Sequence, residues 1–204
     1  MEPLRKDYLE ARAFYSTDSL RIGDAYVMHE WERPLIQHLV DGMALSDRDE
    51  VLEIGFGMGI SATMIQQARP AGHTIVEPHP QILDRADAWQ TGRSGVQLIP
   101  GYWQQLHGMD KRFSAIFFDP FNDDIESVIE ENLQFIVFAA QSLLLEGGRL
   151  ALFCIHPWLD ELYQKVIYEH YRRVEVSPVE VAVRETDDPT RESGGRMISV
   201  ILHK

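Results

Sequence analysis

The stretch Val51–Gly59, with the sequence VLEIGFGMG, constrains the fold of this chain more than any other. Its first four residues are apolar except Glu53 and predict a short buried strand. Glycine then stands at every second position, and apolar residues recur at helical spacing from Ile60 onward. Glycine accepts positive φ and lacks a Cβ, so a ligand can approach this backbone closely. With the unpaired amides of a helix N-terminus beyond it, the turn suits a nucleotide-like ligand at the edge of an open α/β sheet.

The residues after the last glycine distinguish between types of nucleotide site. A phosphate-binding P-loop needs Lys-Ser or Lys-Thr there, whereas this chain has Ile60-Ser61. A dinucleotide fingerprint, Gly-x-Gly-x-x-Gly, would place its third glycine where Ile60 stands. The observed Gly-x-Gly-x-Gly, headed by Glu53, resembles the first motif of the class I S-adenosylmethionine-dependent methyltransferases. A glycine turn that binds nothing is the alternative.

Segments with strand-like and helical patterns alternate along the rest of the chain. The further expected strands are 73–77, 96–99, 113–119, 150–155, 174–183 and 197–202. The expected helices are 7–15, 28–39, 60–68, 82–89, 125–145 and 158–170. Such alternation predicts one α/β domain with a mostly parallel seven-stranded sheet and helices on both faces.

Composition narrows the classes of function. The chain has 204 residues, a formal net charge of −13 and one cysteine, Cys154, in an apolar run. Such acidity argues against nucleic acid as a partner and is compatible with a cationic substrate. A single cysteine excludes an intrachain disulfide, and we expect Cys154 to be a core residue. With no leader and no membrane-spanning apolar run, we expect a cytoplasmic chain without a membrane partner, of unknown oligomeric state.

Acidic residues stand where two of the expected strands end, and such strand ends face the ligand crevice of open α/β sheets. Glu77 lies eighteen positions beyond Gly59, close to the spacing at which an acid binds a ribose in Rossmann-like folds. Asp119 ends the strongly apolar strand 113–119. The alternative for Glu77 is an ordinary exposed strand end.

The chain resembles the guanidinoacetate N-methyltransferases and their relatives that methylate arginine side chains. The resemblance extends from Tyr15 to Trp158 and fades in the C-terminal part. It rests on Tyr15, Leu20-Arg21-Ile22, Val27-Met28-x-x-Trp31-Glu32-x-Pro34, Val51–Met58, Gly101-x-Trp103, Asp119, Gln134-Phe135, Leu144-x-x-Gly147-Gly148 and Trp158. It implies a single Rossmann-like class I methyltransferase domain, residues 1–204. Its parts would be an N-terminal helical lid (1–45), a cofactor-binding core (46–160) and a C-terminal helix and strands (161–204).

The cofactor implied by the resemblance is S-adenosyl-L-methionine, with S-adenosyl-L-homocysteine as product. The implied cofactor-binding residues are Tyr15, Met28, Glu53, Gly55, Gly57, Met58, Gly59, Glu77, Pro78, Gly101, Tyr102, Trp103 and Asp119. No metal ligand is implied.

The resemblance assigns the catalytic and substrate-holding roles to Glu32 and Asp119, with Ile155 and His156 as further substrate contacts. A guanidinium is planar and its paired N–H groups fit carboxylates bidentately. It is a poor nucleophile while protonated, so a carboxylate must accept a proton as the nitrogen attacks. The expected reaction is therefore in-line methyl transfer to a small guanidino compound. Without the resemblance, Glu32 would read as a solvated helix charge.

Departures from the family pattern keep other acceptors open. Pro120-Phe121 replaces the Thr-Tyr that follows the family's aspartate, and Pro157 has no N–H to offer a substrate carboxylate. A small-molecule N- or O-methyltransferase with a non-guanidino acceptor is therefore one alternative. Asp119-Pro120-Phe121 also partly resembles the motif of nucleobase amino-methyltransferases, which the negative charge disfavours. A non-catalytic adenosine-ligand module is the remaining alternative.

Overall fold

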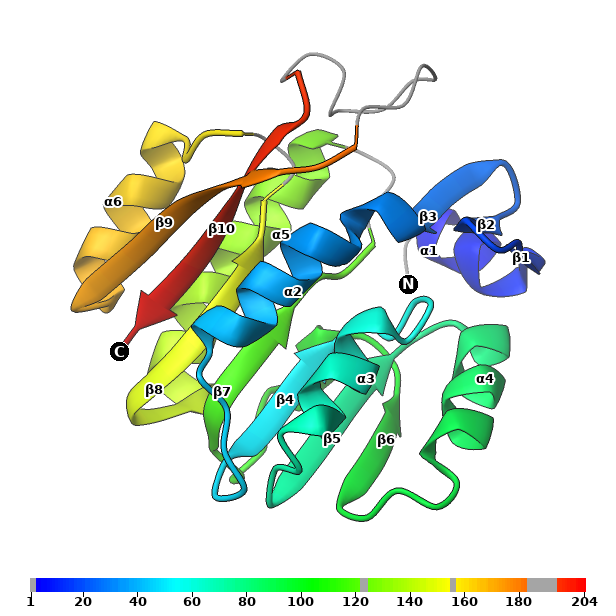
Figure 1. Ribbon diagram of the computed structural model, residues 1–204, viewed down its shortest axis with the longest axis horizontal. Coiled ribbons are helices and arrows are strands. Elements are labelled where there is room, and N and C mark those ends of the chain that lie inside the picture. Colours follow the sequence, from blue (N-terminus) through cyan, green and yellow to red (C-terminus); the bar gives the residue numbers. More distant parts are fainter. Residues whose placement is uncertain (1–2, 122–124, 155–156, 183–193) are drawn as a thin grey trace.

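A seven-stranded sheet forms the centre of the computed structural model, which describes residues 3–121, 125–154, 157–182 and 194–204. Its strand order is β6-β5-β4-β7-β8-β10-β9 (Figure 1). The strands are β4 Glu50–Ile54, β5 Gly72–Glu77, β6 Val96–Pro100, β7 Phe113–Phe118, β8 Leu144–Phe153, β9 Arg173–Glu180 and β10 Arg196–His203. The first five in spatial order are parallel, and β10 is antiparallel to β8 and β9. The mostly parallel seven-stranded sheet expected from the sequence is confirmed.

Helices cover both faces of this sheet and bury two apolar clusters. They are α2 Arg33–Gly42, α3 Ile60–Gln67, α4 Pro80–Gln90, α5 Ile125–Phe138 and α6 Glu161–His170. Apolar residues of α2, α3 and α4 lie in one cluster, and those of α5 and α6 lie in the other. No helix in the described segments is long and apolar enough to cross a membrane.

The direction in which successive strands are added to the sheet reverses at β4. Strands β5 and β6 lie on one side of β4, and β7 and β8 lie on the other. In an open α/β sheet, ligands bind outside the carboxyl ends of the strands at the point where the order reverses. By this rule, the expected ligand site lies at the ends of β4 and β7.

The N-terminal region is helical only in part, and here the expectation of a helical lid was wrong. Helix α1 Pro3–Glu10 is followed by an antiparallel sheet of β1 Ala13–Tyr15, β2 Ser19–Ile22 and β3 Ala25–His29, and then by a 3₁₀ turn Glu30–Glu32. Leu20 and Ile22 are buried and alternate with more exposed neighbours, which is the period of a strand. Gly23, at φ +59°, turns β2 back into β3. Pro34 lies in the first turn of α2, so the helix start expected near it is confirmed.

Two later boundaries also differ from expectation. The helical segment that follows β7 ends in a π-helix at Ala139–Leu143, and β8 begins at once with Leu144. Helix α6 begins at Glu161 rather than at residue 158. Cys154 is buried at the end of β8, as expected.

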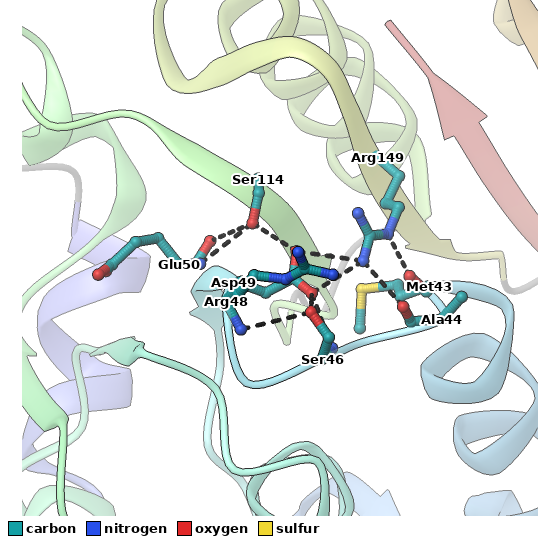
Figure 2. A network of polar contacts seen from close by, with 8 residues as sticks. All are labelled: Met43, Ala44, Ser46, Arg48, Asp49, Glu50, Ser114 and Arg149. Atoms are coloured by element: carbon teal, nitrogen blue, oxygen red, sulfur yellow. Dashed lines mark hydrogen bonds and ion pairs between the residues drawn. The ribbon is translucent and has the colours of Figure 1, made fainter.

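An ion-pair network fixes the loop before β4 to the start of β7 and to Arg149 in the neighbouring strand β8 (Figure 2). Arg149 Nη2 lies 3.2 Å from each carboxylate oxygen of Asp49, and Ser114 Oγ donates to Asp49 Oδ1 at 2.7 Å. The Ser46 amide donates to Asp49 Oδ2 at 2.7 Å. Arg149 also donates to the carbonyls of Met43 and Ala44. The network ties α2 to three strands of the core.

We expect the substitution Asp49→Asn to destabilise the fold by about 2–4 kcal/mol, because it removes the negative charge that compensates the partly buried guanidinium of Arg149. Burial, the largest influence, raises the pKa of Asp49, but Ser114, Ser46 and Arg149 together hold it below its ordinary value. An acid with a lowered folded pKa stabilises the fold above its unfolded pKa, and this contribution is lost as pH falls through the folded pKa.

Urea unfolding from neutral to acid pH checks this prediction. The variant should lose part of the acid dependence that the native chain shows. Asp47→Asn, an exposed aspartate two residues earlier, is the matched control and should leave both stability and its pH dependence unchanged. Equal effects of the two substitutions would contradict the assignment.

Candidate functional site

Three glycines give the turn after β4 its shape. Gly55, Gly57 and Gly59 all have positive φ, at +89°, +52° and +75°. A Cβ on Gly55 would lie 2.5 Å from the carbonyl oxygen of Asp119, and one on Gly57 would lie 2.9 Å from Met28 Sδ. Gly59 is the N-cap of α3. The turn therefore needs glycine both for its backbone angles and for the close approach of its neighbours.

The N-terminal sheet docks directly on this turn. Tyr15 donates a hydrogen bond from its hydroxyl to the carbonyl of Gly57 at 3.2 Å, and the Met58 amide lies 3.3 Å from Met28 Sδ. These contacts join β1 and β3 to the turn, so the structure brings Tyr15, Met28, Gly57 and Met58 together.

Helix α1 adds a residue that sequence reasoning missed. The ring of Tyr8 stacks on Phe121 with centroids 5.6 Å apart and meets the edge of His79 at 5.3 Å. Burial, then the charge of Glu77, raises the pKa of Tyr8. His79 Nε2 lies 3.0 Å from the carbonyl of Ala11, which fixes the end of α1 to the start of α4. Only the mixture of aromatic and charged residues around Tyr8 hinted at this position.

Glu77 is buried at the carboxyl end of β5 and faces the turn. The Phe56 amide donates to Oε2 at 2.9 Å, and the His79 amide donates to Oε1 at 2.8 Å. Burial raises the pKa of Glu77 to about 7, against the opposing hydrogen bonds from the backbone. The backbone amide of Gly57 also bonds to this carboxylate. A carboxylate has about four acceptor positions, so Glu77 can still accept a hydrogen bond from a ligand hydroxyl.

Replacing Glu77 with Gln should weaken S-adenosylhomocysteine binding by about 10–100-fold, because an amide can accept at only one of its two ends. Hydroxyl donors favour the ionised acid, so native affinity should increase as pH rises through about 7, the pKa of Glu77. Calorimetric titration at several pH values measures both effects. Asp84→Asn, on the exposed side of α4, is the control and should bind as the native chain does. If the Gln variant kept the native increase of affinity with pH, Glu77 would not be its source.

Asp119 follows β7 directly and borders the same turn. Its amide donates to the carbonyl of Ile54 at 3.2 Å, and its carbonyl oxygen packs against Gly55. Its surface is partly exposed. Burial, then the negative charge of Glu53, raises the pKa of Asp119 to about 7. A carboxyl group with such a pKa can exchange a proton near neutral pH.

Glu32 is 8% exposed and lies in the 3₁₀ turn between β3 and α2. The His29 amide donates to its Oε1 at 2.8 Å. Glu32 is therefore a buried, anchored carboxylate, and the alternative of a solvated helix charge is wrong. It lies four residues beyond Met28, which touches the glycine turn.

The remaining predicted cofactor residues lie around or behind the same edge. Glu53 is fully buried and is bonded to Ser61 and His73. The Trp103 ring packs in the core, with its centroid 5.3 Å from that of Phe135. Gly101, Tyr102 and Pro78 are partly exposed at the ends of β6 and β5. Ile155 and His156 lie outside the described residues.

The donor set fits an adenosyl ligand. A glycine turn leaves backbone room at the end of β4, and Glu77 offers a buried carboxylate at the end of the next strand. This is the arrangement in which Rossmann-like sheets hold a ribose. The described residues contain no group of three or more His, Cys, Asp or Glu able to hold a metal ion.

Solved structures similar to this chain share its fold. The N-methyltransferase NodS from Bradyrhizobium japonicum WM9 has a TM-score of 0.65 and 15% identity, covering 85% of this chain and 96% of that one. Spermidine synthase from Thermotoga maritima has a TM-score of 0.68 and 13% identity, covering 95% and 72%. A putative methyltransferase complexed with SAH, SMU.776, has a TM-score of 0.62 and 15% identity, covering 90% and 52%. At these identities the likeness shows the fold alone.

Sequence relatives are more specific. Protein arginine N-methyltransferase 2 of Aspergillus fumigatus is 31% identical over 171 residues, covering 78% of this chain and 39% of that protein. The Yarrowia lipolytica protein of the same name is 30% identical over 138 residues, covering 61% and 29%. The chain thus spans about a third of the length of these curated relatives. A family model described as guanidinoacetate N-methyltransferase matches residues 2–185. Because that match covers most of the sequence, the chain belongs to the guanidinoacetate N-methyltransferase family.

Proposed function

We propose that this chain is an S-adenosylmethionine-dependent N-methyltransferase that acts on a small guanidino compound. The observation that carries the proposal is Asp119, which follows β7 at the switch point of the sheet and whose backbone carbonyl packs against Gly55. Burial raises the pKa of its carboxyl group to about 7. Membership of the family and a second buried carboxylate, Glu32, support it.

The cofactor supplies an electrophilic methyl group on a cationic sulfonium. In this proposal Glu77 accepts hydrogen bonds from the ribose hydroxyls, and Gly55, Gly57 and Gly59 admit the ligand close to the backbone. Tyr15 and Met28 of the N-terminal sheet, together with Met58 of the turn, form one wall. The adenine side is bordered by Pro78, Gly101, Tyr102 and the backbone of Trp103. Glu53 lies behind the turn, where it is bonded to Ser61 and His73.

The acceptor is a cation, and the chain's own acids would hold it. Glu32 and Asp119 present carboxylates that a planar guanidinium can bind bidentately. Asp119 takes the proton that the attacking nitrogen loses, and a site closed to water strengthens both interactions. Ile155 and His156, after β8, remain the proposed contacts for the rest of the substrate.

The N-terminal elements favour a small acceptor over a protein. Tyr8 reaches across from α1 to Phe121, two residues beyond Asp119, so the segment covers the edge where the acceptor would bind. The curated relatives are named for arginine in proteins, which makes a protein arginine the second candidate. A non-guanidino amine or hydroxyl is the third, because Pro120 and Pro157 depart from the family pattern.

Calorimetric titration tests the proposal. The chain is first saturated with S-adenosylhomocysteine and then titrated with guanidinoacetate, free arginine or an arginine-containing peptide. We expect a small guanidine to bind and the peptide not to bind; the reverse would favour the second candidate. Glu32→Gln should lose the guanidine while still binding S-adenosylhomocysteine. No binding of S-adenosylhomocysteine by the native chain would overturn the proposed cofactor.

A further inference from the structure

The N-terminal sheet of β1, β2 and β3, at the end of the molecule away from β9 (Figure 1), has one covered and one exposed face. Leu20, Ile22 and Met28 point into the core and are at most 6% exposed. Phe14 of β1 and Tyr26 of β3 point the other way and are 42% and 56% exposed. Met28 contacts the glycine turn from the covered face, so neither of these rings is part of the proposed cofactor site.

Arg21 joins the two exposed rings into a row across the three strands. Phe14 of β1 pairs with Arg21 of β2, and Arg21 pairs with Tyr26 of β3. Residues paired directly across strands point to the same side of a sheet. The guanidinium carbon of Arg21 lies 5.8 Å from the centroid of the Phe14 ring and 5.7 Å from that of the Tyr26 ring. A second guanidinium, that of Arg12, lies 5.0 Å from the centroid of the Phe14 ring.

These four residues, called the arginine–aromatic face below, carry two positive charges that are not neutralised within the described part of the chain. Neither Arg12 nor Arg21 forms an ion pair there, although the sequence has 32 acidic residues against 19 lysines and arginines. A guanidinium that lies over a ring keeps N–H groups for an acceptor, and the ring restricts its movement before a partner binds. The face therefore presents two preorganised donors for anions.

Shielding of the rings from water is the structural alternative for the two arginines. It does not account for the exposure of the rings, because each remains about half exposed with a guanidinium lying over it. Arginine and the large aromatic residues are also the side chains enriched where proteins bind one another. Carboxylates complement the arginines, and an apolar side chain complements the rings.

We propose that the arginine–aromatic face is a docking surface for a short acidic segment of a partner protein, in which two carboxylate side chains flank an apolar one. The carboxylates bind Arg12 and Arg21, and the apolar side chain lies on the ring of Phe14 between them. The proposal does not depend on the proposed function, since the face lies outside the cofactor and acceptor sites.

The net charge of −13 favours a short segment over a nucleic acid. A nucleic acid carries a phosphate at every nucleotide, so its charge extends along the molecule beyond the two arginines and meets the acidic remainder of the chain. A short segment touches only the face, and salt screens charges that lie more than about 8 Å away.

Fluorescence anisotropy with a labelled peptide of alternating glutamate and leucine tests the proposal. The native chain should bind this peptide more tightly than a peptide with glutamine in place of glutamate, and the difference should shrink as salt is added. The double variant Arg12→Gln/Arg21→Gln should lose at least about fivefold in affinity for the acidic peptide. Arg48→Gln/Arg69→Gln removes the same charge from two exposed arginines before β4 and β5, and should bind as the native chain does. Thermal melts report whether each variant folds.

A measurement on the native chain locates the peptide without any variant. In ¹⁵N-labelled protein, the backbone amide shifts that change on addition of the acidic peptide should lie in residues 12–26. Changes confined to other parts of the chain would overturn the proposal, as would equal binding of the acidic and the glutamine peptide. Equal losses in the two double variants would make net charge the cause and would also overturn it. Tighter binding of single-stranded oligothymidylate than of the acidic peptide would show a nucleic-acid surface instead.

Discussion

Asp119→Asn should reduce methyl transfer by about 10²–10⁴-fold while leaving S-adenosylhomocysteine binding nearly intact. Asn keeps the shape of the side chain and one acceptor oxygen, but it cannot take the proton that a guanidinium must lose. The backbone of Asp119 remains in place, because its contacts with Ile54 and Gly55 are made by main-chain atoms. A loss of turnover with retained ligand binding separates this role from a folding defect.

The pH dependence gives the same substitution a second readout. Only the ionised form of Asp119 can accept a proton, so kcat/KM should rise with pH through about 7, its pKa in the free chain. A bound guanidinium favours the carboxylate, so the corresponding limb of kcat should lie at lower pH. The Asn variant should lose this limb, and the exposed Asp110→Asn should keep it.

Stability should move in the opposite direction to activity. An acid whose folded pKa, about 7, lies above the ordinary value of 3.8 favours the folded state only while it is protonated. Its contribution is therefore lost as pH rises from about 4 to about 7. At alkaline pH we expect Asp119→Asn to stabilise the fold by roughly 1–3 kcal/mol, allowing for its partial exposure. If the variant were inactive and also less stable at that pH, Asp119 would not be an acid whose ionised form is unfavourable in the fold.

The parts of the site that could be predicted from sequence lie next to one another in the chain. The strand, turn and helix from Val51 onward, and the acids that end β5 and β7, follow from local spacing alone. The order of the sheet then places them at one edge. Local chemistry was sufficient because parallel strands present their carboxyl ends together.

The unpredicted parts depend on contacts between distant residues. Arg149 and Asp49 are 100 positions apart, and Tyr8, near the N-terminus, meets Phe121 in the middle of the chain. His73 is an ordinary strand residue in the sequence, and only the fold shows that it faces Glu53. The strands β1 to β3 are three to five residues long, too short for a period of two to stand out among charged neighbours.

Gly55→Ala should have the largest effect of any conservative substitution in the turn. Its φ of +89° is strained for alanine, and the new Cβ would meet the carbonyl oxygen of Asp119 at 2.5 Å, a backbone atom that cannot rotate away. Relief requires β4 and β7 to separate at their carboxyl ends, where we propose that the cofactor binds. We expect a loss of about 3–5 kcal/mol in stability and at least about a hundredfold loss of S-adenosylhomocysteine affinity.

Gly92→Ala isolates the cause of that loss. Gly92 has a similar φ, +80°, but a Cβ there meets nothing within 4 Å, so only the backbone strain remains. That variant should lose about 1–2 kcal/mol and bind S-adenosylhomocysteine normally. Urea unfolding and calorimetry on both variants measure the difference, which is the contribution of the close approach between Gly55 and Asp119. If the two variants lost the same stability, positive φ alone would explain the glycine. The close packing of the turn against the end of β7 would then have no measurable role.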